Sequence, residues 1–341
     1  MKKRMLAFVL AGMTAVSALM MPMSAAAAAA SQVSGAAVTT VTSELTGLPV
    51  NSALASQRPA AVMIDNDTRA LPHYGLAEAD VVYEMMNSTA NNRVTRLMAL
   101  YKDWQVVNQI GNIRSTRPTN ILLASEWNAI LIHDGGPFYN DAYFTSTGIN
   151  HLSGSFSRVR NGKASEFTEY LKGNELAARA ASGGISSTYT NPSAQQHWNF
   201  AATDLSTKGG ISASVCKLNC FKLTLPSLVY NTASGTYDYY ENGKISKDGE
   251  DGQTVSFKNV ILQDVSFTQY DSNGYLIYNV VGSGVGWYLT NGKAIPIVWL
   301  KASETGITRY YDAKGAEITL NPGKTYVGIC PSDDWSRVLI G

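Results

Sequence analysis

The sequence contains few of the residues from which metal centres are built. Its 341 residues include only three Cys and four His, and they do not form the paired C-x₂-C spacing of a zinc framework. Charged residues are also scarce and balanced, because 27 Lys+Arg stand against 26 Asp+Glu, a formal net charge of +1. Proteins that bind nucleic acid through bulk charge carry a clear basic excess. We therefore expect no metal, no cofactor and no nucleic-acid partner.

Familiar catalytic motifs are absent as well. The chain has no G-x-S-x-G, no P-loop and no H-E-x-x-H, which excludes the commonest signatures of hydrolases, nucleotide-binding proteins and zinc proteases. Its 45% hydrophobic and 10% aromatic residues are typical of a folded globular protein. At this length two domains are expected.

The only long apolar run lies at the N-terminus. Met1-Lys2-Lys3-Arg4 precedes an uncharged stretch from Met5 to about Met21, and small residues follow from Ser24 to Ala30. This order is typical of a signal peptide, here residues 1–30; an uncleaved anchor is the alternative. We expect cleavage, no membrane span afterwards, and a secreted, extracellular protein that is released or associated with the cell wall.

All three cysteines lie beyond that segment. Cys216 and Cys220 have the spacing of a short local bridge, and either could instead pair with Cys330. An exported protein can form disulfides, and an odd number leaves at least one thiol over. The sequence leaves the pairing open.

The chain up to about residue 205 mixes strand and helix patterns. Residues 31–56 are rich in Ser, Thr and Ala and predict a flexible spacer, and a mixed α/β domain follows over residues 57–205. Pro118 at a first-turn position predicts a helix over Thr119–Trp127. Ser165 and Gly183 predict a second helix over about Ser165–Ala181. Apolar and β-branched runs predict strands at Ala60–Ile64, Ala79–Met86, Val94–Tyr101 and Trp127–His133.

The second half has a different character. Short β-rich runs are separated by Asn-Gly pairs at 242–243, 273–274 and 291–292, which are the strongest short hairpin signals because both residues tolerate positive φ. These features predict a mainly antiparallel β domain over residues 211–335. The fold class is therefore α+β, a mixed α/β domain followed by a β-rich domain.

The most informative stretch lies just before the first predicted helix. Arg114 and Arg117 flank Ser115 and Thr116 immediately ahead of Pro118. A helix start presents unpaired N–H groups and a partial positive charge, and Arg supplies planar donors for carboxylate or phosphate. The pattern favours an anion-binding site. The alternative is that both arginines pair with structural carboxylates such as Asp80, Glu84 or Asp134.

Acid–base candidates lie at or near strand ends. Asp80 and Glu84 are four residues apart, which places them on one face of a strand, and two carboxylates can act as acid and base. His133 precedes two glycines and is a candidate general base. These groups also suit structural roles, such as capping turns or pairing with arginine. The carboxylate candidates are Asp65, Asp67, Asp80 and Glu84.

A set of short segments occurs in a characteristic order along the chain: Val62–Asn66, Gly75-Leu76, Ala79–Glu84, Thr95-Arg96, Gly111–Pro118, His133–Gly136, Asn259-Val260, Gly282–Gly284, Asn291–Ala294, Trp299 and Asn321–Tyr326. Together these segments resemble the YerB-like family of bacterial exported proteins. The resemblance covers about residues 58–332 and implies a two-part α+β architecture, often in envelope lipoproteins, with no established enzymatic activity. This chain departs from the family twice: it has no lipid-accepting Cys, and Ser88–Asn92 replaces an acidic-Gly-Gly segment.

The leading hypothesis is a cell-envelope binding protein for an anionic ligand such as a wall polymer. Arg96, Arg114 and Arg117 would supply charge, Ser115 a hydroxyl, and His133 is a further candidate contact. The acidic and amide groups that would orient the arginines or the ligand are Asp65, Asn66, Asp80 and Glu84. One alternative is an envelope hydrolase using Asp65 or Glu84 with His133, and another is an interaction module for a membrane protein.

Overall fold

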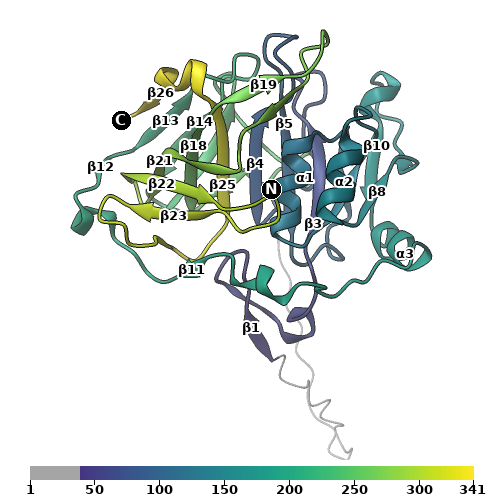
Figure 1. Ribbon diagram of the computed structural model, residues 1–341, viewed down its shortest axis with the longest axis horizontal. Coiled ribbons are helices and arrows are strands. Elements are labelled where there is room, and N and C mark those ends of the chain that lie inside the picture. The colour runs from purple at the N-terminus through teal and green to yellow at the C-terminus, as the bar shows by residue number, and fades with distance from the viewer. Residues whose placement is uncertain (1–38) are drawn as a thin grey trace, which may run out of the picture. The chain divides into compact units, whose positions relative to one another are not determined.

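A computed structural model of the protein describes residues 39–341. The predicted signal peptide and residues 31–38 of the predicted spacer lie outside the described residues. Strands greatly outnumber helices in the described part (Figure 1). The mixed α+β class predicted from the sequence is confirmed.

The largest element is an eleven-stranded sheet that runs across the described part of the chain (Figure 1). Its central strands pair β18 with β25 and β25 with β4 in parallel, and β4 with β5 and β5 with β3 in antiparallel. In spatial order the strands are β12 (Ile211–Ser212), β22 (Lys293–Lys301), β21 (Gly282–Thr290), β18 (Asn259–Val265), β25 (Thr325–Pro331), β4 (Val81–Met86), β5 (Thr95–Tyr101), β3 (Ala60–Asp65), β7 (Ile130–His133) and β8 (His151–Ser153), with β23 (Arg309–Asp312) beside β22.

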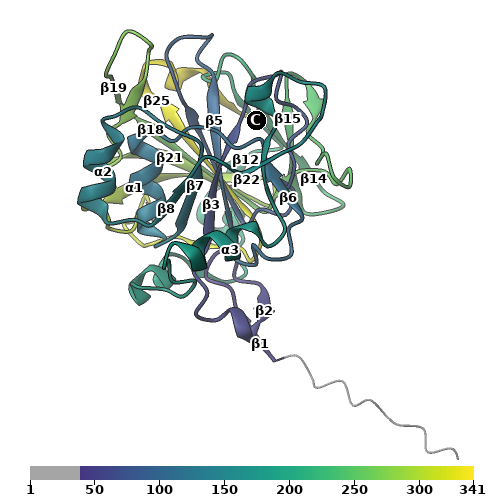
Figure 2. The ribbon, with the colours of Figure 1, turned by 90° about the vertical axis from the view of Figure 1, so that its right-hand side faces the viewer.

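The central strands β3, β4 and β5 of this sheet are covered on both faces, which explains why most of their positions are apolar. Val62 and Ile64 of β3 belong to one core cluster, whereas Ala61 and Met63 belong to the other. Figure 2 shows helices on one side of the sheet and smaller sheets on the other. The core therefore has two layers, one on each face.

The helices pack mainly on one face. Pro118 occupies the first position of α1 (Pro118–Glu126), as the sequence predicted, and the buried side chains of α1 join one core cluster. The remaining helical elements are α2 (Asn140–Thr147), α3 (Glu175–Ser182) and the 3₁₀ turns η1 (Ser52–Leu54), η2 (Ser165–Phe167), η3 (Pro192–Gln196), η4 (Leu205–Lys208) and η5 (Ser332–Arg337).

Smaller sheets cover the opposite face and the edges. A six-stranded sheet consists of β16 (Lys244–Ile245), β15 (Thr236–Glu241), β14 (Ser227–Asn231), β13 (Val215–Leu218) and β26 (Val338–Ile340), with β17 (Ser256–Phe257) beside β15. The others are β6–β10–β9 (Gln109–Gly111, Glu169–Lys172, Ser157–Arg158), β1–β2 (Thr40–Thr42, Pro49–Asn51), β11–β24 (Asn199–Phe200, Thr319–Leu320) and β19–β20 (Phe267–Gln269, Leu276–Tyr278).

Two local predictions are wrong. The helix predicted over Ser165–Ala181 is divided into η2, strand β10 and α3, because Tyr170 and Leu171 gain buried pairing with β6. The described part of the predicted spacer forms the β1–β2 hairpin and η1, with Leu45 fully buried. In both segments tertiary contacts override the local composition.

The two predicted domains share the large sheet. Strand β25 of the second half pairs with β4 of the first, so the boundary between residues 205 and 211 does not separate two sheets. That division remains a prediction. At the predicted turns, Asn242-Gly243 and Asn291-Gly292 join adjacent strands and have positive φ at both residues.

The cysteines are free thiols in the structure. Cys216, Cys220 and Cys330 are all fully buried and belong to the same core cluster. Burial raises the pKa of the Cys216 thiol, which keeps it protonated and unreactive.

Candidate functional site

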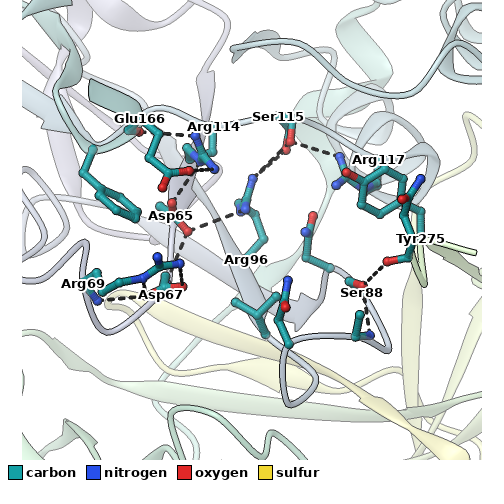
Figure 3. A pocket seen from close by; sticks show the side chains of 16 residues that line it. Asp65, Asp67, Arg69, Ser88, Arg96, Arg114, Ser115, Arg117, Glu166 and Tyr275 are labelled. Carbon is teal, nitrogen blue, oxygen red and sulfur yellow. Dashed lines mark hydrogen bonds and ion pairs between the residues drawn. The ribbon is translucent and has the colours of Figure 1, made fainter. Parts of the chain in front are cut away.

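A polar cavity of about 420 Å³ lies where β3 and β5 approach the start of α1 (Figure 3). We call it the arginine cavity. The loops after β3 and β4, the 3₁₀ turn η2 and the β19–β20 hairpin contribute the rest of its wall, so it draws on segments far apart in the chain. Its lining residues are Asp65, Asp67, Arg69, Asn87, Ser88, Ala90, Asn91, Val94, Arg96, Arg114, Ser115, Arg117, Glu166, Phe167, Asn273 and Tyr275.

Asp65 is the central carboxylate of this cavity. It is the last residue of β3 and lies opposite Arg96 in the pairing with β5. Its Oδ2 is 2.9 Å from Nε of Arg114, and its Oδ1 is 3.6 Å from Nη2 of Arg96. Because Asp65 is 2% exposed, its charge is compensated by arginine rather than by water.

The other carboxylates of the cavity are also paired with arginine. Glu166 contacts Nη2 of Arg114 at 3.1 Å, and Asp67 accepts two hydrogen bonds from Arg69 at 2.9 and 2.8 Å. Arg114 thus pairs with carboxylates of the protein, as the alternative from the sequence had it, but its partners are Asp65 and Glu166 and not the examples Asp80, Glu84 and Asp134. No acidic side chain in the lining is left free to hold a cationic ligand.

Arg117 differs from the other arginines of the cavity. It is the N-cap residue of α1 and is 5% exposed, and within residues 39–341 no carboxylate lies within ion-pair distance of it. Its Nη1 donates to Ser115 Oγ and Thr116 O, and its guanidinium lies 3.9 Å from the ring centroid of Tyr275. Burial, together with the charge of Arg96, lowers the pKa of Arg117 to about 10, which leaves it charged at neutral pH.

Arg96 and Arg117 converge on Ser115 from two elements. Nη1 of each donates to Ser115 Oγ, at 3.3 and 3.1 Å (Figure 3). Burial also lowers the pKa of Arg96. Two buried like charges so close together repel each other, and an anion between them would relieve that repulsion.

The rim opposite Arg96 comes from the second half of the chain. Ser88 Oγ donates to Asn273 O and Thr89 N to Gly274 O, which ties the loop after β4 to the β19–β20 hairpin. The loop then has positive φ at Asn91, Asn92 and Arg93. Three consecutive left-handed non-glycine residues are unfavourable and need such contacts to hold them.

Two predicted site residues lie behind the cavity instead of lining it. Glu84 is fully buried in the middle of β4, and Asn66 donates to it at 3.0 Å. Tyr326 and Tyr239 donate to its other oxygen at 2.7 and 2.8 Å. Glu84 is thus enclosed by hydrogen-bond donors of the protein itself.

Asp80 is remote from this cluster. It precedes β4, so it lies at the other end of the strands from Asp65, which ends β3. It accepts a hydrogen bond from Lys102 N. Burial raises the pKa of Asp80 to about 6. Although Asp80 and Glu84 are four residues apart, the structure does not bring them together as an acid–base pair.

His133 does not line the cavity either. Its Nδ1 donates to Gly135 O at 2.8 Å, so its Nε2 accepts from His151 Nδ1 at 3.0 Å. Burial lowers the pKa of His133 to about 4, which keeps the ring neutral. Among residues 39–341 it makes no hydrogen bond or ion pair with Asp65 or Glu84, the partners required by the hydrolase hypothesis.

Several lining residues were missed by sequence reasoning. Arg69 follows Asp67 by two residues, and that spacing could have indicated a paired turn. Asn87, Asn273 and Tyr275 reach the cavity from loops and Glu166 from η2, and no local pattern marks them.

No helix in the described part of the chain is long and apolar enough to cross a membrane. Within residues 39–341, no group of three or more His, Cys, Asp or Glu side chains has an arrangement that could hold a metal ion.

Comparison with known proteins gives consistent matches. Residues 45–186 and 217–327 match the N-terminal and C-terminal domains of "Protein of unknown function (DUF3048)". The chain is 24% identical to the Bacillus subtilis protein named "Putative lipoprotein YerB" over 308 residues, covering 87% of this chain and 88% of that protein. The crystal structure of Bacillus subtilis YerB has the same fold, with a TM-score of 0.76 and 22% identity over 88% of this chain and 99% of that one. The two family matches together cover most of the chain, which therefore belongs to the DUF3048 family of proteins of unknown function.

Proposed function

We propose that this protein is a binding protein of the cell envelope and that the arginine cavity holds an anionic group of a wall polymer. The envelope assignment is supported by the signal-like N-terminal sequence and by the name of the Bacillus subtilis relative as a lipoprotein. The finer location, secreted and associated with the wall, belongs to the same proposal.

One observation carries the binding proposal. Arg117 is buried and charged but has no carboxylate partner within the described chain, and a second buried arginine lies beside it. A buried charge without a partner is strongly unfavourable. A bound anion supplies the missing partner, because the described residues around Arg117 offer it only neutral hydroxyl, carbonyl and aromatic groups.

The experiment is sedimentation of the protein with purified cell walls. Arg114→Ala/Arg117→Ala is compared with Arg160→Ala/Lys314→Ala, which removes the same charge from exposed positions. We expect wild type and control to sediment with walls, less so at high salt because salt screens charge attraction, and the cavity variant to remain in solution. Equal thermal unfolding of the two variants shows that binding, not folding, was lost. A wild-type protein that stays in solution contradicts the proposal.

The interaction-module hypothesis requires an exposed apolar patch in the β-rich half. Such a patch exists on the outer face of β21 and β22, where Val285 and Val298 are 54% and 44% exposed beside Trp287 and Trp335. Nothing in the described residues indicates which partner would cover this surface.

A further inference from the structure

The direction of the free N–H groups in the arginine cavity indicates which anion it accepts. Arginine binds a carboxylate or a phosphate at two points through two parallel N–H groups on one edge of the guanidinium, and a planar carboxylate matches that planar edge. In Arg96 and Arg117 the Nε that would form half of such an edge is buried and without a hydrogen-bond partner in the described chain. Neither arginine can therefore offer that edge to a ligand in the cavity.

Each of these arginines instead offers a single NH₂ group, Nη2, to a ligand. Nη1 of both is occupied by Ser115, as described above. Nη2 of Arg117 makes no hydrogen bond within residues 39–341, and Nη2 of Arg96 has only the 3.6 Å contact with Asp65. Ser115 Oγ already accepts two hydrogen bonds, so its own hydrogen is available to donate. Three single donors therefore come from three residues.

This arrangement fits a tetrahedral oxyanion better than a planar carboxylate. The acceptor sites of a phosphate spread in three dimensions and can meet single donors from several directions, whereas the acceptor sites of a carboxylate lie in one plane. The side chains of Arg96, from β5, and Arg117, from the start of α1, lie on either side of Ser115 (Figure 3).

The charge of the lining sets how many negative charges the ligand carries. Four arginines face three carboxylates, and the carboxylates are paired with Arg69, Arg96 and Arg114. One positive charge, on Arg117, is left over. A phosphodiester carries one negative charge, whereas a phosphate monoester carries nearly two at neutral pH. The neutral side chains next to this position are hydrogen-bonding groups that suit hydroxyls: Asn87, Ser88, Asn91 and Asn273.

We propose that the arginine cavity binds a phosphodiester that links polyol or sugar units, with its charged oxygens between Nη2 of Arg96 and Nη2 of Arg117 and a hydrogen bond from Ser115. This inference rests on the proposed function, because it names the chemistry of the anion that the same cavity holds.

The test is calorimetric titration of the protein with three probes of similar size. Glycerophosphoglycerol is the phosphodiester, glycerol 3-phosphate the monoester and glycerate the carboxylate. We expect the diester to bind at least about tenfold more tightly than either other probe. Arg117→Ala should weaken diester binding about ten- to a hundredfold, the range for a hydrogen bond to a charged group. Ser115→Ala, which removes only one hydroxyl, should weaken it severalfold, and Arg160→Ala should leave it unchanged.

The wall-binding experiment separates failure of this inference from failure of the proposed function. Tighter binding of glycerate or of the monoester overturns the phosphodiester assignment and leaves an anion-binding cavity. Wall binding that depends on Arg117 but persists after hydrofluoric acid has cleaved the phosphodiesters of the wall has the same meaning. A protein that binds neither walls nor any probe contradicts both proposals.

Discussion

Glu84 offers a direct test of whether a buried carboxylate next to the cavity is structural or catalytic. It has no cationic partner within residues 39–341, and its two oxygens accept four hydrogen bonds at 2.7–3.0 Å, from Asn66, Thr95, Tyr239 and Tyr326. Burial raises the pKa of Glu84, and the four donors oppose that rise. We predict that Glu84→Gln lowers the free energy of unfolding.

The magnitude follows from the donors. Gln preserves the shape of the side chain but replaces one carboxylate oxygen with an NH₂ group, so two of the four donors face another donor. Each buried donor left unsatisfied costs about 1–3 kcal/mol. Removing the buried charge offsets part of this loss of stability, because an ionised carboxylate is itself unfavourable in the interior. We expect a net loss of about 3 kcal/mol.

Urea unfolding followed by tryptophan fluorescence measures this loss. Glu166→Gln is the matched control, since Glu166 lies at the exposed edge of the same cavity, and we expect it to change stability by less than about 1 kcal/mol. An unchanged or more stable Glu84→Gln protein would refute the reasoning. It would also favour a functional role, because groups kept for activity often destabilise the fold.

Two further predictions concern neighbouring groups. Burial and the charge of Glu84 raise the pKa of Glu241 to about 8 from an ordinary value near 4.5, so between these values the folded state binds more protons than the unfolded state. Stability should therefore fall as pH rises through this window, and Glu241→Gln should reduce that slope in urea midpoints measured from pH 5 to 9. Tyr275→Ala should weaken wall binding severalfold, because the cation–π contact with Arg117 is lost. Tyr275→Phe, which keeps the ring, should bind like wild type in the same sedimentation assay.

Much of the local structure follows from sequence patterns. The apolar runs predicted as strands correspond to β3, β4, β5 and β7, and Pro118 marks the start of α1. These elements have a strong local signal, because a strand buried on both faces is apolar throughout. The segment around β10 has no such signal. Its strand state depends on pairing with β9, which is near in sequence, and with β6, which is distant in sequence.

In the candidate site, some contacts also follow from sequence patterns, whereas others arise only from the fold. Asp65 and Arg96 meet because neighbouring strands place them opposite each other, and Arg114, Ser115 and Arg117 follow from the helix start. Asp80 is also an aspartate near a strand end, but it lies at the start of β4, whereas Asp65 lies at the end of β3. Because β3 and β4 run parallel, the two carboxylates are at opposite ends of the sheet. Tyr275 is about 160 positions from Arg117, and only the fold brings the two together.

The position of Glu84 connects the cavity to the joint between the two halves of the chain. Strand β4 carries Glu84 and pairs with β25, which carries Tyr326, while Tyr239 reaches the same carboxylate from the six-stranded sheet. Asn66 donates to Glu84 and directly follows Asp65. One buried carboxylate therefore ties both halves together immediately behind the residue that holds Arg96 and Arg114. These contacts predict that Glu84, a catalytic candidate by sequence, positions the arginine cavity instead of acting in catalysis.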